Sequence, residues 1–355
     1  YVEYVCDEPS NVCGGWGDRM KGILSAYGLS LLLNRKFSLL ITKPCNMELI
    51  LRPNEVDWLE LRSRADFVQL NSSNFFIREN FGLVKEFETN NFMSYINQSY
   101  YRTSNIIKLK TNLMMINAVA KNPTVSARLK EIGFNDPKKF KLYYQTYNWY
   151  KKLFKLAPKY DKKYSSILSK AKPNKSTFLI CSQLRIGGKT QANNQNDEVF
   201  TQGNESMKFW QFINEKYVNE RVKSNDTNYR IFITSDLDYI RNEAERVFGK
   251  EYVVYNPDKP SHIDKDFRGA IQNDNCDGID STIIDFHMLQ HCDAAVMSHS
   301  GFGVLGTWNR PEPSKEFYVF TKKDQNELRR NYGDRTNLTF VKIEDLEKDL
   351  YMGHD

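Results

Sequence analysis

The sequence lacks a long apolar run. No stretch of the 355 residues approaches about 18 consecutive apolar side chains, the length that a membrane-spanning helix needs. Its first residues, YVEYVCDEPSN, also lack an initiator Met and the charged and apolar segments of a signal peptide. We therefore expect a mature or truncated piece, associated with a membrane only through an anchor missing from this chain.

Metal ligands are sparse. The five His are scattered, and the six Cys form no CxxC pair or Cys/His cluster with zinc-site spacing. His287 and His291 lie one helical turn apart, but no HExxH acid accompanies them, which favours ordinary helix histidines. We expect no cofactor and no bound metal.

Neither basic nor acidic residues strongly predominate in the sequence. Lys and Arg number 50 against 44 Asp and Glu, a formal net charge of +6, and no basic block or stripe is present. This pattern argues against a nucleic-acid partner. A mild positive excess suits an anionic small molecule or an anionic surface, and it is also typical of an ordinary, slightly basic protein surface.

The residues that are present indicate an oxidising compartment. Six cysteines are an even number, which is compatible with disulfides, although only Cys6 and Cys13 are close enough in sequence to suggest a local pair. N-x-S/T sequons add a weak signal at Asn71, Asn97, Asn174, Asn204, Asn225 and Asn337. Together these features predict the lumen of the secretory pathway, with the Golgi expected and the ER as the alternative.

Length and hydrophobic pattern predict an α/β protein of two domains. Residues 19–33 have apolar side chains at helical spacing, and residues 37–42 have the pattern of a short buried strand. The middle of the chain contains helical patterns at 113–132 and 143–157 but no chemical motif. We divide the chain into an N-terminal α/β domain (1–170), a C-terminal Rossmann-like domain (171–340) and a C-terminal tail (341–355).

In the second half, strand and helix patterns alternate. Strands are predicted at 177–186, 229–235, 251–256 and 294–298, helices at 206–222, 236–249 and 281–292, and a loop that enters a helix at 300–309. Such alternation predicts a parallel, doubly wound sheet. Ligands of these sheets bind beyond the carboxyl ends of the strands, so we expect a site in the loops that follow.

The first of these strands ends with Arg185, and Gly187 and Gly188 follow in the loop. Arg presents a rigid fork of donors that suits phosphate oxygens, and glycine lets a backbone approach a ligand closely. The alternative is an Arg at a strand end that makes a surface salt bridge.

A second loop begins with Ser298 and continues through Ser300 and Gly301 into a helix. Exposed N–H groups at a helix N-terminus, together with hydroxyls, form an anion site. The alternative is a simple Ser N-cap with a Gly turn.

Two further features involve acids. Asp285 lies in an apolar helix, where an acid is expected to be paired or to contact a ligand. Asp236 and Asp238 follow a strand and resemble a DxD metal site, although acids are also favoured in the first turn of a helix.

The loops combine into one hypothesis. Arg185 and the Ser298–Gly301 loop would bind a diphosphate, and Asp285 would accept hydrogen bonds from a base such as guanine. Positive charge at the site would neutralise a leaving diphosphate without a metal. The sequence therefore predicts a nucleotide-sugar donor site.

The order of these motifs resembles the GDP-fucose-dependent fucosyltransferase superfamily, over residues 11–42 and about 177–310. The resemblance implies a GT-B-like fold, with two Rossmann-like domains facing a cleft, the first on the acceptor side and the second binding the nucleotide sugar. In that family an H-x-R-R-G/T-D motif binds the donor diphosphate. Arg185 matches its first Arg, while Gln183 and Ile186 replace the His and the second Arg.

Other family positions match residue by residue. The acid that reads guanine matches Asp285, the T-x-S-S block matches the loop from Ser298, and the Gly-rich turn matches residues 14–18. The donor-binding residues that the resemblance and the motifs imply are Gly15, Gly17, Arg19, Gln183, Arg185, Gly187, Asp285, Ser298, Ser300, Gly301 and Phe302.

The implied activity is inverting transfer of fucose from GDP-fucose to a hydroxyl of a glycan or glycoprotein. Arg185 would stabilise the leaving diphosphate, and the catalytic base would be Asp18, Asp197 or Glu198. Two alternatives stay open: a metal-dependent GT-A-type glycosyltransferase that uses Asp236 and Asp238, and a non-catalytic glycan-binding relative.

Overall fold

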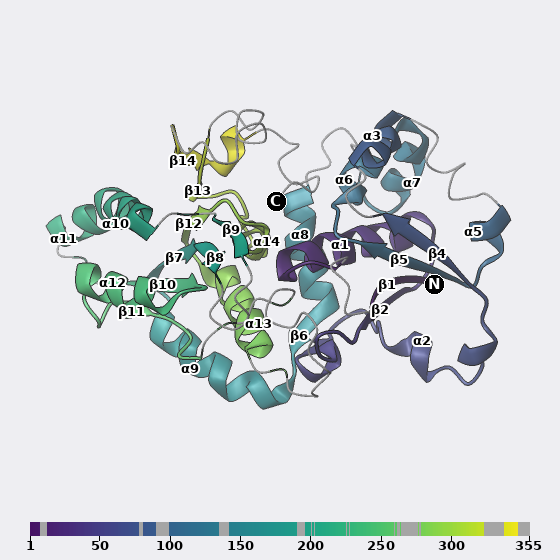
Figure 1. Cartoon of the computed structure of the whole chain (residues 1–355), viewed down its shortest axis with the longest axis horizontal. Coiled ribbons are helices and arrows are strands. Elements are labelled where there is room, and N and C mark those ends of the chain that lie inside the picture. Colours follow the sequence, from purple (N-terminus) through teal and green to yellow (C-terminus); the bar gives the residue numbers. More distant parts are fainter. Residues whose placement is uncertain are drawn as a thin grey trace. The chain divides into compact units, whose positions relative to one another are not determined.

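The structure is a computed structural model, and it describes residues 1–7, 13–77, 81–89, 99–134, 142–189, 196–199, 201, 203–224, 226, 228–258, 260, 263, 276, 278–322 and 337–346. These residues form two compact units (Figure 1). The first unit comprises the described residues up to Ala157 together with Cys276, and the second comprises the others from Pro158 onward. The second unit thus includes the helix at 161–171 and the strand at 339–342. The sequence-based boundary at 170 places nearly all of that helix in the first domain, and the boundary at 340 cuts through that strand.

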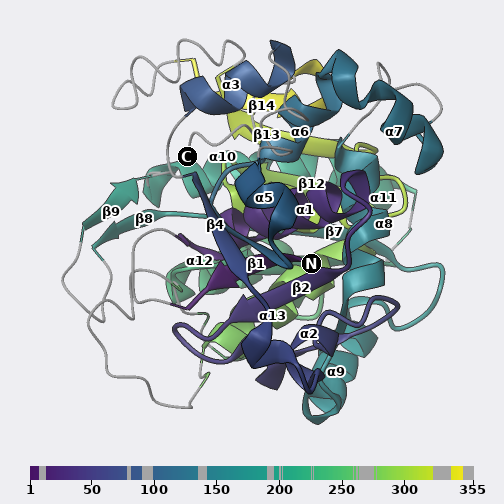
Figure 2. The same ribbon diagram turned by 90° about the vertical axis from the view of Figure 1, so that its right-hand side faces the viewer.

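The first unit is built on a parallel sheet of four strands in the order β2-β1-β5-β4. Figure 2 shows this unit with the neighbouring strands β1 and β2. The strands of this sheet are β1 (Val2–Cys6), β2 (Phe37–Ile41), β4 (Ser72–Ile77) and β5 (Ile106–Thr111), and a separate antiparallel pair is formed by β3 (Leu51–Pro53) and β6 (Phe154–Leu156). The helices are α1 (Trp16–Leu32), α2 (Glu60–Ser63), α3 (Phe81–Thr89), α5 (Ser99–Thr103), α6 (Met115–Lys121), α7 (Ser126–Glu131) and α8 (Leu142–Leu153).

The second unit contains a six-stranded sheet in the order β11-β10-β7-β12-β13-β14. All neighbours are parallel except β13 and β14. The strands are β7 (Phe178–Leu184), β10 (Tyr229–Ser235), β11 (Val253–Val254), β12 (Ala294–Ser298), β13 (Phe317–Thr321) and β14 (Thr339–Lys342), with a separate antiparallel pair β8 (Gly187–Lys189) and β9 (Asn196–Val199). The helices are α9 (Asp161–Ala171), α10 (Ser206–Ile213), α11 (Asn219–Lys223), α12 (Asp238–Phe248), α13 (Ile279–Met288) and α14 (Gly301–Trp308), and a π-helical turn at Asn214–Val218 joins α10 to α11. The predicted parallel, doubly wound sheet is therefore confirmed.

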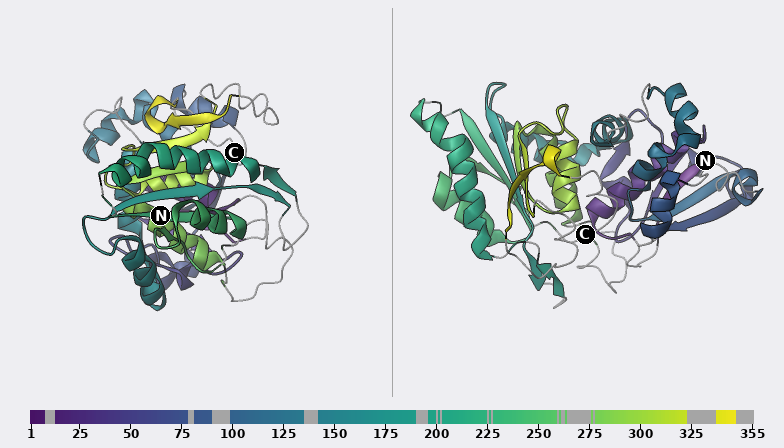
Figure 3. Two further views of the ribbon diagram at one scale, coloured as in Figure 1. Left: turned by 90° about the vertical axis from the view of Figure 1, so that its left-hand side faces the viewer. Right: turned by 90° about the horizontal axis from the view of Figure 1, so that it is seen from above.

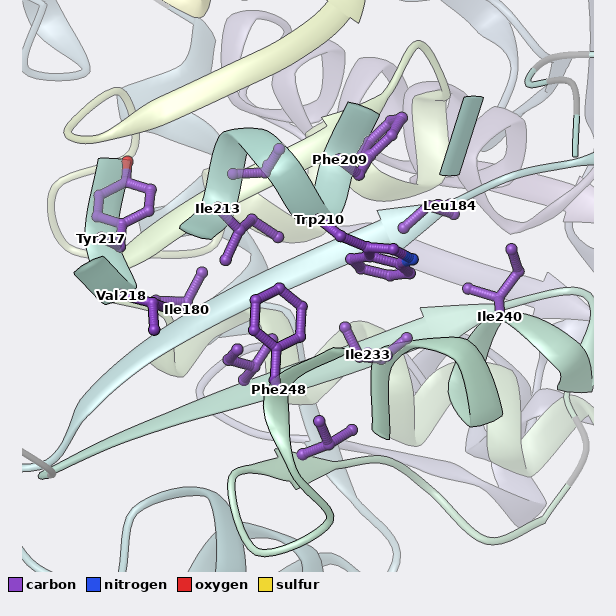
Figure 4. Packing of buried hydrophobic residues seen from close by; sticks show 14 of the residues in the cluster. Ile180, Leu184, Phe209, Trp210, Ile213, Tyr217, Val218, Ile233, Ile240 and Phe248 are labelled. Carbon is purple, nitrogen blue, oxygen red and sulfur yellow. The ribbon is translucent and has the colours of Figure 1, made fainter. Parts of the chain in front are cut away.

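Alternate residues of β7 face opposite sides of this sheet, and helices cover both sides (Figure 3). On one side, Ile180 and Leu184 join a buried cluster with Trp210 of α10 and Phe248 of α12, drawn in Figure 4. On the other side, Cys181 forms a disulfide with Cys292, next to β12. Buried aliphatic and aromatic contacts of this kind hold the sheet rigid, which gives the loops at its edge a fixed base.

Most predicted elements of the second half are present within a few residues. The patterns at 177–186, 229–235 and 294–298 form β7, β10 and β12, and those at 281–292 and 300–309 form most of α13 and α14. In the first half, the helical pattern at 113–132 is split into α6 and α7, because Pro123 cannot continue a helix. None of the helices in the described ranges combines the length and the hydropathy needed to cross a membrane.

Candidate functional site

The candidate site lies at the carboxyl ends of β10, β7 and β12 in the second unit. From β7 the chain proceeds to β10 and β11 on one side, and then returns to place β12 and β13 on the other side. The crevice of a doubly wound sheet opens where the strand order reverses in this way. The reversal lies between β7 and β12, which end at Leu184 and Ser298.

The loop after β7 is held by side chains from both neighbouring strands. The N–H of Arg185 donates to Ser298 Oγ at 2.8 Å. The N–H groups of Ile186 and Gly187 donate to the two carboxylate oxygens of Asp236, Oδ1 at 2.9 Å and Oδ2 at 2.8 Å. Gly187 has a φ of +73°, a left-handed conformation that favours glycine. The backbone of Arg185 is thus fixed, and its side chain is half-buried at the sheet edge.

Gln183 and Ser298 contact each other directly. The Ser298 hydroxyl donates to Gln183 Oε1 at 3.1 Å, and both side chains are buried. A Cβ atom at Gly303, in α14, would lie 2.5 Å from the same Gln183 oxygen, so only glycine leaves room for this contact. Gln183 and Ser298 therefore support the Arg185 loop from beneath, whereas the sequence had suggested direct contact with a ligand.

Helix α14 begins at the same edge. Ser300 is its N-cap residue, and the carbonyl of Ser300 accepts the N–H of Val304 at 3.1 Å. The side chain of Ser300 makes no capping hydrogen bond, and Gly301 occupies the first helical position. Phe302 is half-buried and packs edge-on against Phe286 of α13, with ring centroids 5.4 Å apart. The first N–H groups of α14 thus lie beside the Arg185 loop, in the arrangement that suits an anion.

Asp285 of α13 is 1% exposed. Its Oδ2 accepts a hydrogen bond from Thr234 Oγ1 of β10 at 2.6 Å, while Oδ1 is buried and accepts none from the residues that the structure describes. A buried carboxylate oxygen in this state is costly to maintain, since each unsatisfied polar group keeps its full desolvation penalty. The carboxylate is the kind of acceptor that can read the N–H edge of a base.

Burial raises the pKa of the Asp285 carboxyl to about 6, against the opposing effects of the Thr234 hydrogen bond, the charge of Arg241 and the nearby Asn256 side chain. Arg241 lies in α12, is 5% exposed and has buried Nε and Nη2 atoms with no hydrogen-bond partner in the described ranges. At neutral pH, Asp285 is therefore ionised in a desolvated site with a cationic neighbour.

The two acids of the DxD-like pair have different partners. Both oxygens of Asp236 accept backbone hydrogen bonds from the Arg185 loop, whereas Asp238 Oδ1 lies 3.6 Å from Arg241 Nη1 with a 63% exposed side chain. In the described part of the chain, no group of three or more His, Cys, Asp or Glu residues is arranged to hold a metal ion. Asp236 acts here as a structural acceptor.

Two of the candidate bases, Asp197 and Glu198, lie on β9. The backbone of β9 pairs antiparallel with β8 directly after the Arg185 loop. Their side chains lie outside the described part of the structure. Asp197 and Glu198 stay predictions.

The Gly-rich turn of the first unit leads from β1 into α1. Gly15 is the N-cap residue of α1, and Gly17 and Asp18 lie in its first turn. Gly14 has a φ of +63°, and a Cβ there would lie 2.2 Å from Asp18 Oδ2, so glycine is required. The Asp18 carboxylate pairs with Lys21 Nζ at 3.0 Å and keeps 27% of its side-chain surface exposed.

Arg19 is a buried residue of α1. Its side chain is 3% exposed, and its guanidinium donates from Nε to the Gly14 carbonyl at 3.1 Å and from Nη1 to the Lys43 carbonyl at 2.6 Å. Arg19 thus ties the Gly-rich turn to the segment that follows β2. The donor-binding role that the resemblance implies for Arg19 stays a prediction.

Sequence reasoning missed the roles of Asp236, Thr234 and Arg241. Asp236 reaches the loop after β7 because β10 is the neighbour of β7, and Thr234 and Arg241 act on Asp285 of α13, placements that no local pattern reveals. The available signal was the run Thr234-Ser235-Asp236 at a strand end, because short polar side chains there commonly bond adjacent loops.

No family model matches the chain, and no curated protein sequence is similar to it. Solved structures with the same fold include a mutant of Arabidopsis thaliana FUT1 in complex with GDP, which has a TM-score of 0.56 and 12% identity over 96% of this chain and 73% of that chain. NodZ α-1,6-fucosyltransferase co-crystallized with GDP has a TM-score of 0.47 and 11% identity over 96% and 98% of the two chains. POFUT1 in complex with GDP-fucose has a TM-score of 0.44 and 12% identity over 89% and 97%. The similarity to FUT1 confirms the expected resemblance at the level of the fold, a GT-B fold.

Proposed function

We propose that this chain is a fucosyltransferase that uses GDP-fucose as donor and a hydroxyl of a glycan or glycoprotein as acceptor. The observation that carries the proposal is a pair of groups at the carboxyl edge of one parallel sheet. Arg185 is held there by its backbone, and Asp285 keeps a buried oxygen that accepts no hydrogen bond within the described residues. The similarity in fold to FUT1, whose solved structure contains GDP, supports a guanine nucleotide as the ligand.

Each part of the donor has a proposed partner. The Arg185 guanidinium binds the diphosphate, since a planar fork of donors matches phosphate oxygens. The N-terminus of α14, with Ser300, Gly301 and Phe302, lies at the phosphates or the fucose. Asp285 accepts the N–H donors of guanine, which adenine does not present in the same positions.

The reaction forms a bond between the acceptor oxygen and C1 of fucose and breaks the bond between C1 and the diphosphate oxygen. GDP leaves with the bonding electron pair, and the acceptor proton passes to a carboxylate base. Asp18, Asp197 and Glu198 are the proposed bases, and inversion at C1 follows if attack and departure are on opposite faces. Arg185 stabilises the developing charge of the diphosphate, so the step proceeds without a metal ion.

The proposed location is the lumen of the secretory pathway, with the Golgi favoured. Three disulfides, Cys6–Cys13, Cys45–Cys276 and Cys181–Cys292, support an oxidising compartment, and no described cysteine is free.

The test is calorimetric titration of the purified chain with GDP, GDP-fucose and UDP-galactose, with EDTA present throughout. We expect binding of the two guanine nucleotides only. Arg185→Ala should weaken GDP binding about 10- to 150-fold, the equivalent of about 1.5–3 kcal/mol for a charge-assisted contact. Arg230→Ala is the matched control, because Arg230 lies near the opposite, amino end of β10.

Three results would contradict the proposal. Absence of guanine-nucleotide binding would favour the non-catalytic glycan-binding alternative. Nucleotide binding that appears only when the titration is repeated without EDTA and with added Mn²⁺ would favour a metal-dependent transferase. Equal effects of Arg185→Ala and Arg230→Ala on GDP affinity would show that Arg185 does not bind the diphosphate.

A further inference from the structure

Three successive N–H groups in the loop after β7 are bonded by the chain's own side chains. Ser298 accepts the N–H of Arg185, and Asp236 accepts those of Ile186 and Gly187. The three distances lie between 2.8 and 2.9 Å. Asp236 is itself oriented by Ser235, whose hydroxyl donates to the Leu184 carbonyl at 2.8 Å and lies 3.4 Å from Asp236 Oδ1.

Successive N–H groups around a left-handed residue form a concavity that binds anions, often a phosphate. Gly187, with its φ of +73°, makes such a concavity here. The carboxylate of Asp236 already occupies it with both oxygens. A ligand phosphate therefore cannot use these N–H groups, which corrects the expectation that the backbone at Gly187 approaches the diphosphate.

We infer that Asp236 is a positioning residue for the donor diphosphate. Its carboxylate fills the anion concavity of the loop and thereby fixes the backbone from which the Arg185 side chain extends. The inference rests on the proposed function, because it presumes that Arg185 binds the diphosphate. It assigns phosphate recognition to the Arg185 side chain rather than to the loop backbone.

The competing explanation is that Asp236 only stabilises the fold and does not position Arg185. Asp293 provides a matched control for this explanation. Asp293 Oδ2 accepts the N–H of Leu179 at 2.7 Å, near the opposite end of β7, and pairs with Lys172 at 2.8 Å. Asp236 and Asp293 thus both hold the backbone of the same strand or of the loop after it. Only Asp236 acts next to Arg185.

The experiment compares Asp236→Asn with Asp293→Asn in the full chain by calorimetry, using GDP and guanosine as probes. An Asn side chain offers one acceptor where Asp offers two, so one loop N–H loses its partner. We expect Asp236→Asn to weaken GDP binding about 10-fold, as loss of an orienting contact commonly does, and to leave guanosine binding unchanged. Asp293→Asn should leave the binding of both probes unchanged, whatever its effect on thermal stability.

A double-mutant cycle provides the readout that separates positioning from stability. If Asp236 acts through Arg185, Asp236→Asn should change GDP affinity little once Arg185 is replaced by Ala. If Asp236→Asn does not fold, Ser298→Ala removes the third contact to the same loop and should show the same selective loss for GDP.

The outcomes distinguish this inference from the proposed function. Wild-type binding of GDP with equal affinities for the two Asn variants would overturn the role of Asp236 and leave the proposed function intact. Equal losses for GDP and guanosine would also overturn it. No binding of GDP by the wild type would overturn the proposed function and, with it, the donor role of Asp236.

Discussion

The carboxylate of Asp285 is strongly desolvated, with 1% of the residue exposed. Its pKa of about 6, against an ordinary value of 3.8, means that ionising it in the folded state costs about 3 kcal/mol at neutral pH. Because the folded pKa is raised, its contribution to stability is largest at low pH and is lost as the pH rises from about 4 to 6. A bound guanine would offset this cost by donating to the free oxygen.

We therefore predict that base recognition depends on the ionised form of Asp285. Guanosine affinity should fall about 10-fold between pH 7 and pH 5, because about one-tenth of a group with a pKa near 6 is ionised at pH 5. Calorimetric titration at the two pH values measures the change, and guanosine avoids the titration of phosphate. Asp285→Asn should bind weakly at both values. A similar decrease in that variant would contradict the prediction.

At the residue scale, the candidates that the sequence could nominate are those whose chemistry is visible from their immediate neighbours. Arg185 ends a strand, and Asp285 stands alone among apolar neighbours in a helix, so both are visible in the sequence. The burial of Arg19 could not be predicted, because its partners at Gly14 and Lys43 depend on how the turn and the segment after β2 fold back on each other. Asp236 was misread for the same reason, since its partners belong to the loop after another strand.

At the scale of elements, α9 packs against α13 and the 3₁₀ turn after it (Leu289–His291) through histidines. The Tyr164 hydroxyl of α9 shares a hydrogen bond with His291 Nε2 at 2.5 Å, and the Tyr164 ring lies edge-on to His287, with ring centroids 6.2 Å apart. Burial lowers the pKa of both histidines to about 4. Because these folded values lie below the ordinary 6.5, the stabilisation is complete above about pH 6.5 and is lost as the pH falls toward 4.

We predict that His291→Gln reduces the loss of stability in acid. Gln keeps an acceptor for the Tyr164 hydroxyl but takes up no proton. At pH 5 each buried histidine should cost about 2 kcal/mol, so the fall in unfolding free energy between pH 7 and pH 5 should be smaller in the variant by about that amount. Chemical denaturation at the two pH values measures it. Equal falls in variant and wild type would show that another group titrates.

Elements were predictable from periodicity in the second half of the chain, whereas β3, β4, β5 and β6 in the first half were missed. Strand β1 was missed, and it contains Glu3, which is only 1% exposed. Glu3 is tolerated because Arg62 donates to it at 2.5 Å and Ser38 at 3.2 Å. These partners come from β2 and α2, which are distant in sequence. From the sequence alone, Glu3 is therefore expected to be exposed, which hides the buried strand.

At the scale of the whole molecule, the disulfides connect distant parts of the chain. Cys6–Cys13 spans only 7 residues, and this local pair could be suggested from the sequence. Cys45–Cys276 spans 231 residues. It joins Cys276 to the first unit, although the chain segments that precede and follow the region of Cys276 belong to the second unit. No spacing rule predicts such a pair, because the number of possible connectivities of six cysteines is too large.

We predict that a cut in the chain between α9 and β7 does not separate the fragments. With a site-specific protease sequence introduced at Lys175, which is exposed, only Cys45–Cys276 spans the cleavage point. A non-reducing denaturing gel should show one species and a reducing gel two. A cut at Lys315, which no described disulfide spans, is the control and should release a fragment without reductant. Separation after cleavage at Lys175 without reductant would contradict the pairing.

The Cys45–Cys276 bridge also has a consequence for synthesis on the ribosome. Cys276 is translated 231 residues after Cys45, so at about 5–20 residues per second Cys45 waits some ~10–50 s for its partner. During that interval Cys45 is a thiol in the presence of Cys6, Cys13 and Cys181, each a wrong partner. Rapid closure of the short Cys6–Cys13 loop would remove two of these competitors early. The order in which the bridges close is thereby coupled to the direction of translation, and the N-terminal unit is covalently complete only after most of the C-terminal unit has been made.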